Sequence, residues 1–176
     1  MATPAELMSQ AQTALERQNY PLAVDRLERF LAARPGDLEA GRLLAQAWRE
    51  RGDMLAAEQA LVGVLRLRGE VEGAIELWLE LADLRLLMGR PEDAARACRH
   101  ALIHDPSQWE AYYLLGNCFL DARAAPEAVK AYREALTLNP FEREIWHNLL
   151  VAYETLADDR GIAEAKDALA RFREPD

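Results

Sequence analysis

The sequence has few of the residues that attach a protein to nucleic acid or to a membrane. Lysine and arginine together number 21 against 30 acidic residues, and the formal net charge of −9 disfavours binding to phosphate backbones and anionic lipids. No window approaches the roughly 18 apolar residues of a membrane span, and MATPAELMSQAQ at the N-terminus has no signal-peptide pattern. We therefore expect a cytoplasmic protein that binds neither nucleic acid nor membrane.

Residues arranged for catalysis or for metal binding are equally scarce. Cys98 and Cys118 have no CxxC spacing and are expected to be small core residues, a disulfide or a reactive thiol being the alternative. His100 and His104 lie four positions apart on a predicted helix, but two ligands do not complete a metal site, so we expect solvated histidines. The sequence has no P-loop, no dinucleotide-binding fingerprint and no HExxH motif. We expect no enzymatic activity, no cofactor and no metal.

The sequence contains instead one pattern of apolar residues that is repeated about five times. Pro106 and Pro140 lie 34 residues apart, and the residues before each can be superimposed. Apolar residues recur at intervals of three and four, which is the period of an α-helix, so no strand is expected. The repeat units are predicted at about residues 4–37, 38–74, 75–108, 109–142 and 143–176. The best-defined copy carries the pattern Tyr112, Leu115, Gly116, Phe119, Ala128, Tyr132, Ala135 and Pro140.

This pattern resembles the tetratricopeptide repeat, a helix-turn-helix unit of about 34 residues with the motif W-x2-L-G-x2-Y, then A-x3-F and a closing proline. The resemblance covers almost the whole chain. It implies an all-α fold in which residues 1–176 form a single α-solenoid domain of about five repeats, a right-handed superhelix with a concave groove.

Several copies depart from the motif. Gly41 replaces the opening aromatic residue of the second copy, and Leu150 replaces the small residue of the fifth. The join RLRGEVEGAI, residues 66–75, adds about three residues, and the loop ADDRG, residues 157–161, is expected to be about three residues longer than its counterparts.

Small residues and helix caps indicate how the two helices of a unit meet. Gly116 costs a helix about 1 kcal/mol relative to alanine, but other copies have alanine in the same place. We therefore expect that a small residue at this position lets the paired helices approach closely. Capping-box spacing is found at two predicted helix starts, and glycine is found at two predicted helix ends: Thr3 with Glu6, Ser107 with Glu110, Gly52 and Gly89.

The resemblance implies a non-enzymatic adaptor that binds a peptide or a helix of a partner protein in the concave groove, which the first helix of each unit lines. The groove candidates are the positions on these helices that avoid the core: Arg42, Gln46, Arg49, Leu79, Asp83, Leu86, Tyr113, Asn117, Leu120, His147, Asn148 and Val151.

Within this set, Asn117 and Asn148 could hold a peptide backbone, because an amide side chain both donates and accepts hydrogen bonds. Acidic residues lie between the arginines and the asparagines, so a partner segment that is apolar or of mixed charge is favoured over an acidic tail: Glu76, Glu80 and Asp83. The apolar candidates would form a strip along the groove, or they pack against a neighbouring helix, and we weigh the two interpretations equally: Leu79, Leu86, Leu87, Tyr113 and Leu120.

A second class of function is an assembly scaffold that self-associates or builds a larger complex through its end helices. The first helix, AELMSQAQTALE, carries few charges, whereas a solenoid needs polar ends to remain soluble. This composition favours a partner that covers the N-terminal helix, and a homodimer through that helix is one form of it.

Overall fold

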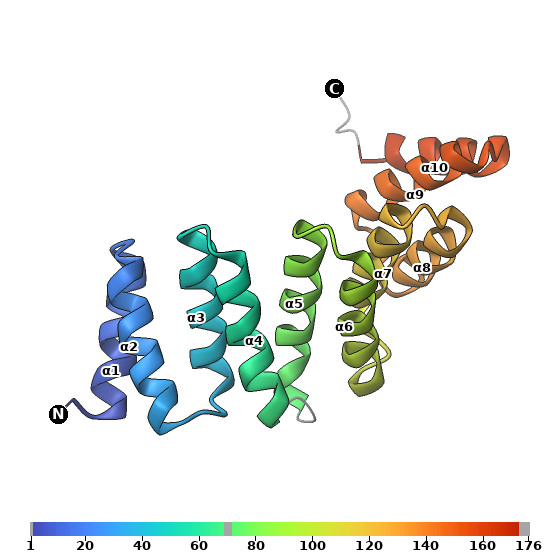
Figure 1. Cartoon of the computed structure of the whole chain (residues 1–176). Helices are drawn as coiled ribbons and strands as arrows, with labels where there is room; N and C mark the ends of the chain where they lie inside the picture. Colours follow the sequence, from blue (N-terminus) through green and yellow to red (C-terminus); the bar gives the residue numbers. More distant parts are fainter. Residues whose placement is uncertain (1, 69–71, 173–176) are drawn as a thin grey trace. The chain divides into compact units, whose positions relative to one another are not determined.

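The computed structural model describes residues 2–68 and 72–172, and these residues are helical throughout apart from short connections. Their ten α-helices follow one another in five pairs (Figure 1): α1 (Pro4–Glu16) with α2 (Tyr20–Ala33), α3 (Leu38–Glu50) with α4 (Met54–Arg68), α5 (Ile75–Leu87) with α6 (Pro91–His104), α7 (Trp109–Asp121) with α8 (Ala125–Leu138), and α9 (Arg143–Leu156) with α10 (Asp159–Ala170). One short 3-10 helix, Glu72–Ala74, precedes α5. The all-α prediction is confirmed, while the expected insertion at the second join includes residues 69–71, which lie outside the described residues.

Local signals start and stop these helices. The capping box of α1 is present, because the Glu6 carboxylate accepts from the Thr3 backbone N–H at 2.7 Å and the Thr3 hydroxyl accepts from the Glu6 N–H at 3.3 Å. Gly52 and Gly89 have φ of 84° and 69°, which stops α3 and α5 as predicted. The capping box expected at Ser107 is wrong: its hydroxyl donates to the Asp105 carboxylate at 2.6 Å, and α7 begins later, at Trp109.

The contacts divide the chain into two compact units, Met1–Leu84 and Arg85–Asp176. In the first unit, α2 packs against α1 and α3, and α3 packs against α4. In the second unit, α7 packs against α6 and α8, and α9 packs against α8 and α10. Each unit contains its own cluster of buried apolar residues, so each presents its own surface made from first helices.

Glycines permit close helix contacts in both units. A Cβ atom added at Gly116 on α7 would lie 2.4 Å from the nearest ring carbon of Tyr132 on α8, which confirms the packing role predicted for this glycine. A Cβ atom added at Gly41 on α3 would lie 2.1 Å from a methyl carbon of Val64 on α4. The absence of an aromatic side chain at position 41 therefore gives the second pair its close approach.

In the fifth pair the glycine lies on the second helix and the aromatic ring on the first. A Cβ atom added at Gly161, on the second helix, would lie 2.4 Å from the ring of Tyr153, on the first. Only Ala157 and Asp158 separate α9 from α10, and the Asp158 carboxylate accepts from the Gly161 N–H at 3.1 Å. The longer loop expected here is wrong, because α10 begins at Asp159, 34 residues after α8 begins at Ala125, and so keeps the regular spacing of the repeats.

The outward side of α1 is polar where later first helices are apolar. Gln10 and Thr13 are exposed. In later repeats the residues at the position of Thr13 are buried: Ala47, Leu84, Cys118 and Ala152. Three of the residues at the position of Gln10 are buried as well: Leu44, Leu81 and Leu149. We refer to Ser9, Gln10 and Thr13 as the polar outer face of α1.

Candidate functional site

The predicted groove residues all lie on first helices, but they are divided between the two compact units. Five lie in the first unit, on α3 and α5: Arg42, Gln46, Arg49, Leu79 and Asp83. The other seven lie in the second unit, on α5, α7 and α9: Leu86, Tyr113, Asn117, Leu120, His147, Asn148 and Val151. Each unit therefore presents its own candidate surface.

The candidate surface of the first unit contains a cavity of about 260 Å³, which we call the Glu80 cavity. It is lined by Arg42, Ala45, Gln46, Arg49, Glu50, Leu61, Glu80 and Leu84. Three of the predicted groove residues are among them, whereas Leu79 is not, and Asp83 takes part through an ion pair with Arg49. The buried residues Ala45, Leu61 and Leu84 form the apolar part of the lining. The sequence pattern alone did not indicate Glu50, Leu61 or Leu84 because their contribution depends on how α3, α4 and α5 pack.

The ion pairs around the Glu80 cavity differ in length, from hydrogen-bonded contacts to a distance of 3.9 Å. Arg42 donates two hydrogen bonds to Glu39, at 3.1 and 3.0 Å, while its guanidinium lies 3.9 Å from the Glu80 carboxylate. Arg49 lies 3.7 Å from the Asp83 carboxylate. The two longer distances exceed those of charge-assisted hydrogen bonds. Burial raises the pKa of Glu80, and the attraction of Arg42 and Arg49 offsets this only in part.

In the second unit, side chains from α7, α8 and α9 form a polar network. The Asn117 Oδ1 atom accepts from the Tyr132 hydroxyl at 2.7 Å and from Asn148 Nδ2 at 2.9 Å. Asn148 Nδ2 also donates to the Tyr113 hydroxyl at 3.2 Å. Tyr132 is fully buried, and burial raises the pKa of its phenol. The two asparagines therefore bind each other, and the sequence pattern did not indicate the contact of Asn117 with Tyr132.

The network leaves one amide donor group and one amide acceptor unused. Asn117 Nδ2 and Asn148 Oδ1 have no hydrogen-bond partner among the described residues. In the same part of the chain, no buried side-chain nitrogen or oxygen lacks a partner, so these two atoms are open to solvent. We call them the amide pair. A donor and an acceptor from adjacent first helices match the two polar groups of a peptide bond.

The apolar groove candidates have different surroundings. Tyr113 and Leu120 pack against the core of the second unit, which fits the interpretation that they contact neighbouring helices. Val151 and Leu87 are 47% and 64% exposed. Leu79 and Leu86 are partly buried, and His147 is exposed.

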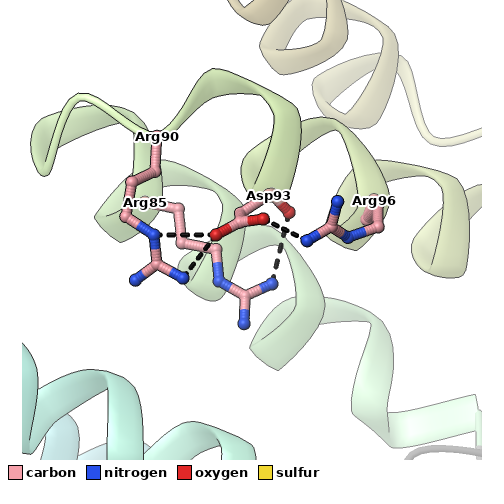
Figure 2. Close-up of polar contacts among 4 residues, drawn as sticks. All are labelled: Arg85, Arg90, Asp93 and Arg96. Carbon is pink, nitrogen blue, oxygen red and sulfur yellow. Dashed lines mark hydrogen bonds and ion pairs between the residues drawn. The ribbon is translucent and has the colours of Figure 1, made fainter.

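A cluster of charged residues at the turn between α5 and α6 was not indicated by the sequence pattern (Figure 2). The Asp93 carboxylate accepts from Arg90, with a Nε distance of 2.7 Å, and from Arg96, while Arg85 donates to the Asp93 backbone carbonyl at 3.2 Å. The hydrogen bond from Arg90, together with the charges of Arg96 and Arg85, lowers the pKa of Asp93. These contacts join the end of α5 to the first turn of α6, so we assign them a structural role.

The described residues offer little else for chemistry. Cys98 and Cys118 are buried free thiols, and the pKa of Cys98 is raised by its hydrogen bond with Cys118 and by burial. No group of three or more potential metal ligands occurs in the described part of the chain. His100 is exposed. Among residues 2–68 and 72–172, no helix is long and apolar enough to cross a membrane.

Comparisons with known proteins agree with this architecture. No curated protein matches the sequence. The structure is similar to that of MamA, residues 41 to the end, from Desulfovibrio magneticus RS-1, with a TM-score of 0.84 and 21% identity over 99% of each chain. It is also similar to PilF of Pseudomonas aeruginosa, with a TM-score of 0.78 and 15% identity over 98% of this chain and 78% of that one. For YrrB, described as a TPR protein with an unusual peptide-binding site, the TM-score is 0.77 and the identity 15%, over 95% of this chain and 84% of that one.

Similarity at these identities shows the fold. A family assignment comes from the sequence, because the Tetratricopeptide repeat family profile matches residues 8–70 and 79–143. The chain belongs to the tetratricopeptide repeat family.

Proposed function

We propose that this protein is a non-enzymatic adaptor that binds an extended segment of a partner protein along the first helices of its repeats. The observation that carries the proposal is the amide pair, which presents one donor group and one acceptor on α7 and α9. The network behind the pair fixes the orientation of both side chains, so little side-chain entropy remains to be lost on binding. The peptide-binding site of YrrB supports the same use of this fold.

The amide pair binds the partner's backbone and not a particular side chain. A carbonyl of the segment accepts from Asn117 Nδ2, and a backbone N–H donates to Asn148 Oδ1. Each such bond contributes about 1 kcal/mol, and leaving a desolvated group unpaired costs about 1 to 3 kcal/mol. The pair therefore sets the register of the segment, while neighbouring side chains such as Val151 and His147 contact its side chains.

The polar outer face of α1 counts against the alternative of self-association through the N-terminal helix. Gln10 and Thr13 are exposed polar side chains at positions where later repeats have apolar ones, and Ser9 beside them is exposed as well. Covering them with a second copy would remove water from three hydrogen-bonding groups and requires that the copy replace those bonds. The adaptor is therefore the function that we favour.

The test is the substitution Asn117→Asp. Aspartate keeps an oxygen that accepts from Tyr132 and Asn148, so the network is retained, but it replaces the open NH2 group with a second acceptor. The matched control is Asn19→Asp in the first unit, where the side chain caps α2 by accepting from the Leu22 N–H at 3.3 Å. Aspartate caps a helix as well as asparagine does, and the change in net charge is the same.

A displayed library of random dodecapeptides is selected against the wild-type protein, and the enriched peptide is labelled and titrated by fluorescence anisotropy. We expect Asn117→Asp to weaken its binding by about 5-fold to 150-fold, the equivalent of 1 to 3 kcal/mol, and Asn19→Asp to leave it unchanged. Failure to enrich any peptide, or equal binding by Asn117→Asp and the wild type, would overturn the proposal.

A further inference from the structure

The Glu80 cavity has the size and lining of a pocket for one side chain. Its volume of about 260 Å³ lies just below the roughly 300 to 1,000 Å³ of pockets for whole small-molecule ligands. Leu61, Leu84 and Ala45 are at most 2% exposed and so form the deep part of the lining, while the charged side chains form its open part. Such a lining suits a long side chain with an apolar stem and a polar head.

The charges in and beside the cavity carry an excess of acid. The arginines are Arg42 and Arg49, and the acidic residues are Glu39, Glu50, Glu80 and Asp83. Glu39 already accepts two hydrogen bonds from Arg42, and Asp83 is the ion-pair partner of Arg49. Two carboxylates, those of Glu50 and Glu80, therefore remain without a hydrogen bond among the described residues. An entering carboxylate would meet this excess of negative charge, whereas an entering cation would neutralise part of it.

The Glu80 carboxylate is the acceptor to which a hydrogen-bond donor entering the cavity would bind. Its side chain is 35% exposed, and Arg42, its ion-pair partner at 3.9 Å, lies beyond hydrogen-bond distance. Burial raises the pKa of this carboxyl, and the negative charges of Glu39 and Asp83 add to the effect. The carboxylate has thus lost part of its hydration without gaining a hydrogen bond in exchange, a situation that a cationic donor would reverse.

From the cavity and its uneven charges, we propose that the Glu80 cavity receives an arginine side chain of the partner segment, with the Glu80 carboxylate accepting from its guanidinium. The inference rests on the proposed function, in that the arginine belongs to a segment of another protein. Arginine fits better than lysine because its planar head donates two parallel hydrogen bonds to a carboxylate. Its methylene stem lies along the lining of the cavity.

The probe is N-acetyl-L-arginine N-methylamide, titrated into the protein labelled with 15N and followed by NMR. We expect saturable shifts of the backbone amides of Arg42, Glu80 and Leu84, with a dissociation constant on the order of 1 mM, as befits a single side chain. The citrulline analogue, which has the same shape and no charge, serves as the chemical control and should give no saturable shift.

Two variants complete the test. Glu80→Gln should weaken binding of the arginine probe by at least about tenfold, the equivalent of 1.4 kcal/mol. Glu76→Gln, an exposed acid one turn earlier on α5, should bind the probe as the wild type does. The inference is overturned by equal shifts with citrulline, by wild-type affinity in Glu80→Gln, or by no saturable shift in the wild type. Any of these three outcomes refutes only the arginine inference if the selected dodecapeptide still binds the wild type and Asn117→Asp still weakens that binding. The proposed function then stands.

Discussion

Replacing Gly116 with alanine adds one methyl group where α7 meets α8. The new Cβ atom would lie 2.4, 2.5 and 2.8 Å from three ring carbons of Tyr132. Restoring an ordinary contact of 3.4 Å requires the ring to retreat by about 1 Å. Tyr132 is fully buried, and its hydroxyl donates to Asn117 at 2.7 Å, so the ring has no space to enter and a hydrogen bond to lose.

Three contributions determine how much Gly116→Ala changes the free energy of unfolding. Overpacking of a filled core costs about 1 to 3 kcal/mol, and the lost hydrogen bond costs about 1 kcal/mol. Alanine in place of glycine returns about 1 kcal/mol of helix propensity. Gly116→Ala should therefore lower the free energy of unfolding by about 1 to 3 kcal/mol, measured by urea titration with far-UV circular dichroism.

The matched control is Gly63→Ala on α4. A Cβ atom added there meets nothing within 4 Å, so only the propensity gain applies, and we expect stabilisation of up to about 1 kcal/mol. A double-mutant cycle with Tyr132→Leu supplies a second check, because a shorter side chain should remove most of the penalty of Gly116→Ala. The packing explanation is refuted if Gly116→Ala stabilises as Gly63→Ala does, or if its penalty is undiminished in the Tyr132→Leu background.

Further predictions concern titrating groups. Burial raises the pKa of Glu80, so the stability contributed by its protonated form is lost as pH rises through the folded pKa. Glu80→Gln should thus be more stable than the wild type at pH 7, by less than about 1 kcal/mol because solvent screens the carboxylate. In urea titrations this difference in unfolding free energy should vanish below about pH 4, where the wild-type carboxyl is protonated. Arg90 lowers the pKa of Asp93, so Asp93→Asn should lower the free energy of unfolding by about 1 kcal/mol at neutral pH. This difference should disappear as the pH falls through the folded-state pKa of Asp93, because the wild-type carboxylate is then protonated. Cys98 and Cys118 should react with a disulfide reagent only after unfolding, and rapid labelling of the native protein would contradict their burial.

Helix pairing could be predicted from the sequence because its signals are local. The period of apolar residues and the glycines at positions 52 and 89 depend on neighbours within one or two turns, and both predictions are confirmed. The role of Gly116 could also be predicted, because alanine holds its place in other copies. The start of α10 was mispredicted from its apolar residues, although Asp158 caps this helix as Asn19 caps α2 and Asp53 caps α4.

The candidate sites could be predicted only as positions on a helix face. Periodicity placed Asn117 and Asn148 on first helices, but which of their atoms remain open depends on Tyr132, which reaches Asn117 from another helix. The Glu80 cavity likewise requires the relative placement of α3, α4 and α5. Contacts between helices that are distant in sequence set these details, and no local pattern encodes them.

The polar outer face of α1 also constrains how such a chain can lengthen by gene duplication. A tandem copy of the first repeat would place one set of Gln10 and Thr13 side chains inside the array, at positions where later repeats bury apolar residues such as Leu44 and Ala47. Each buried polar group without a partner would cost about 1 to 3 kcal/mol. Duplication of the fourth repeat, residues 109–142, would instead place the buried Cys118 at the position that Thr13 occupies. We therefore expect duplication of the fourth repeat to destabilise the array less than duplication of the first.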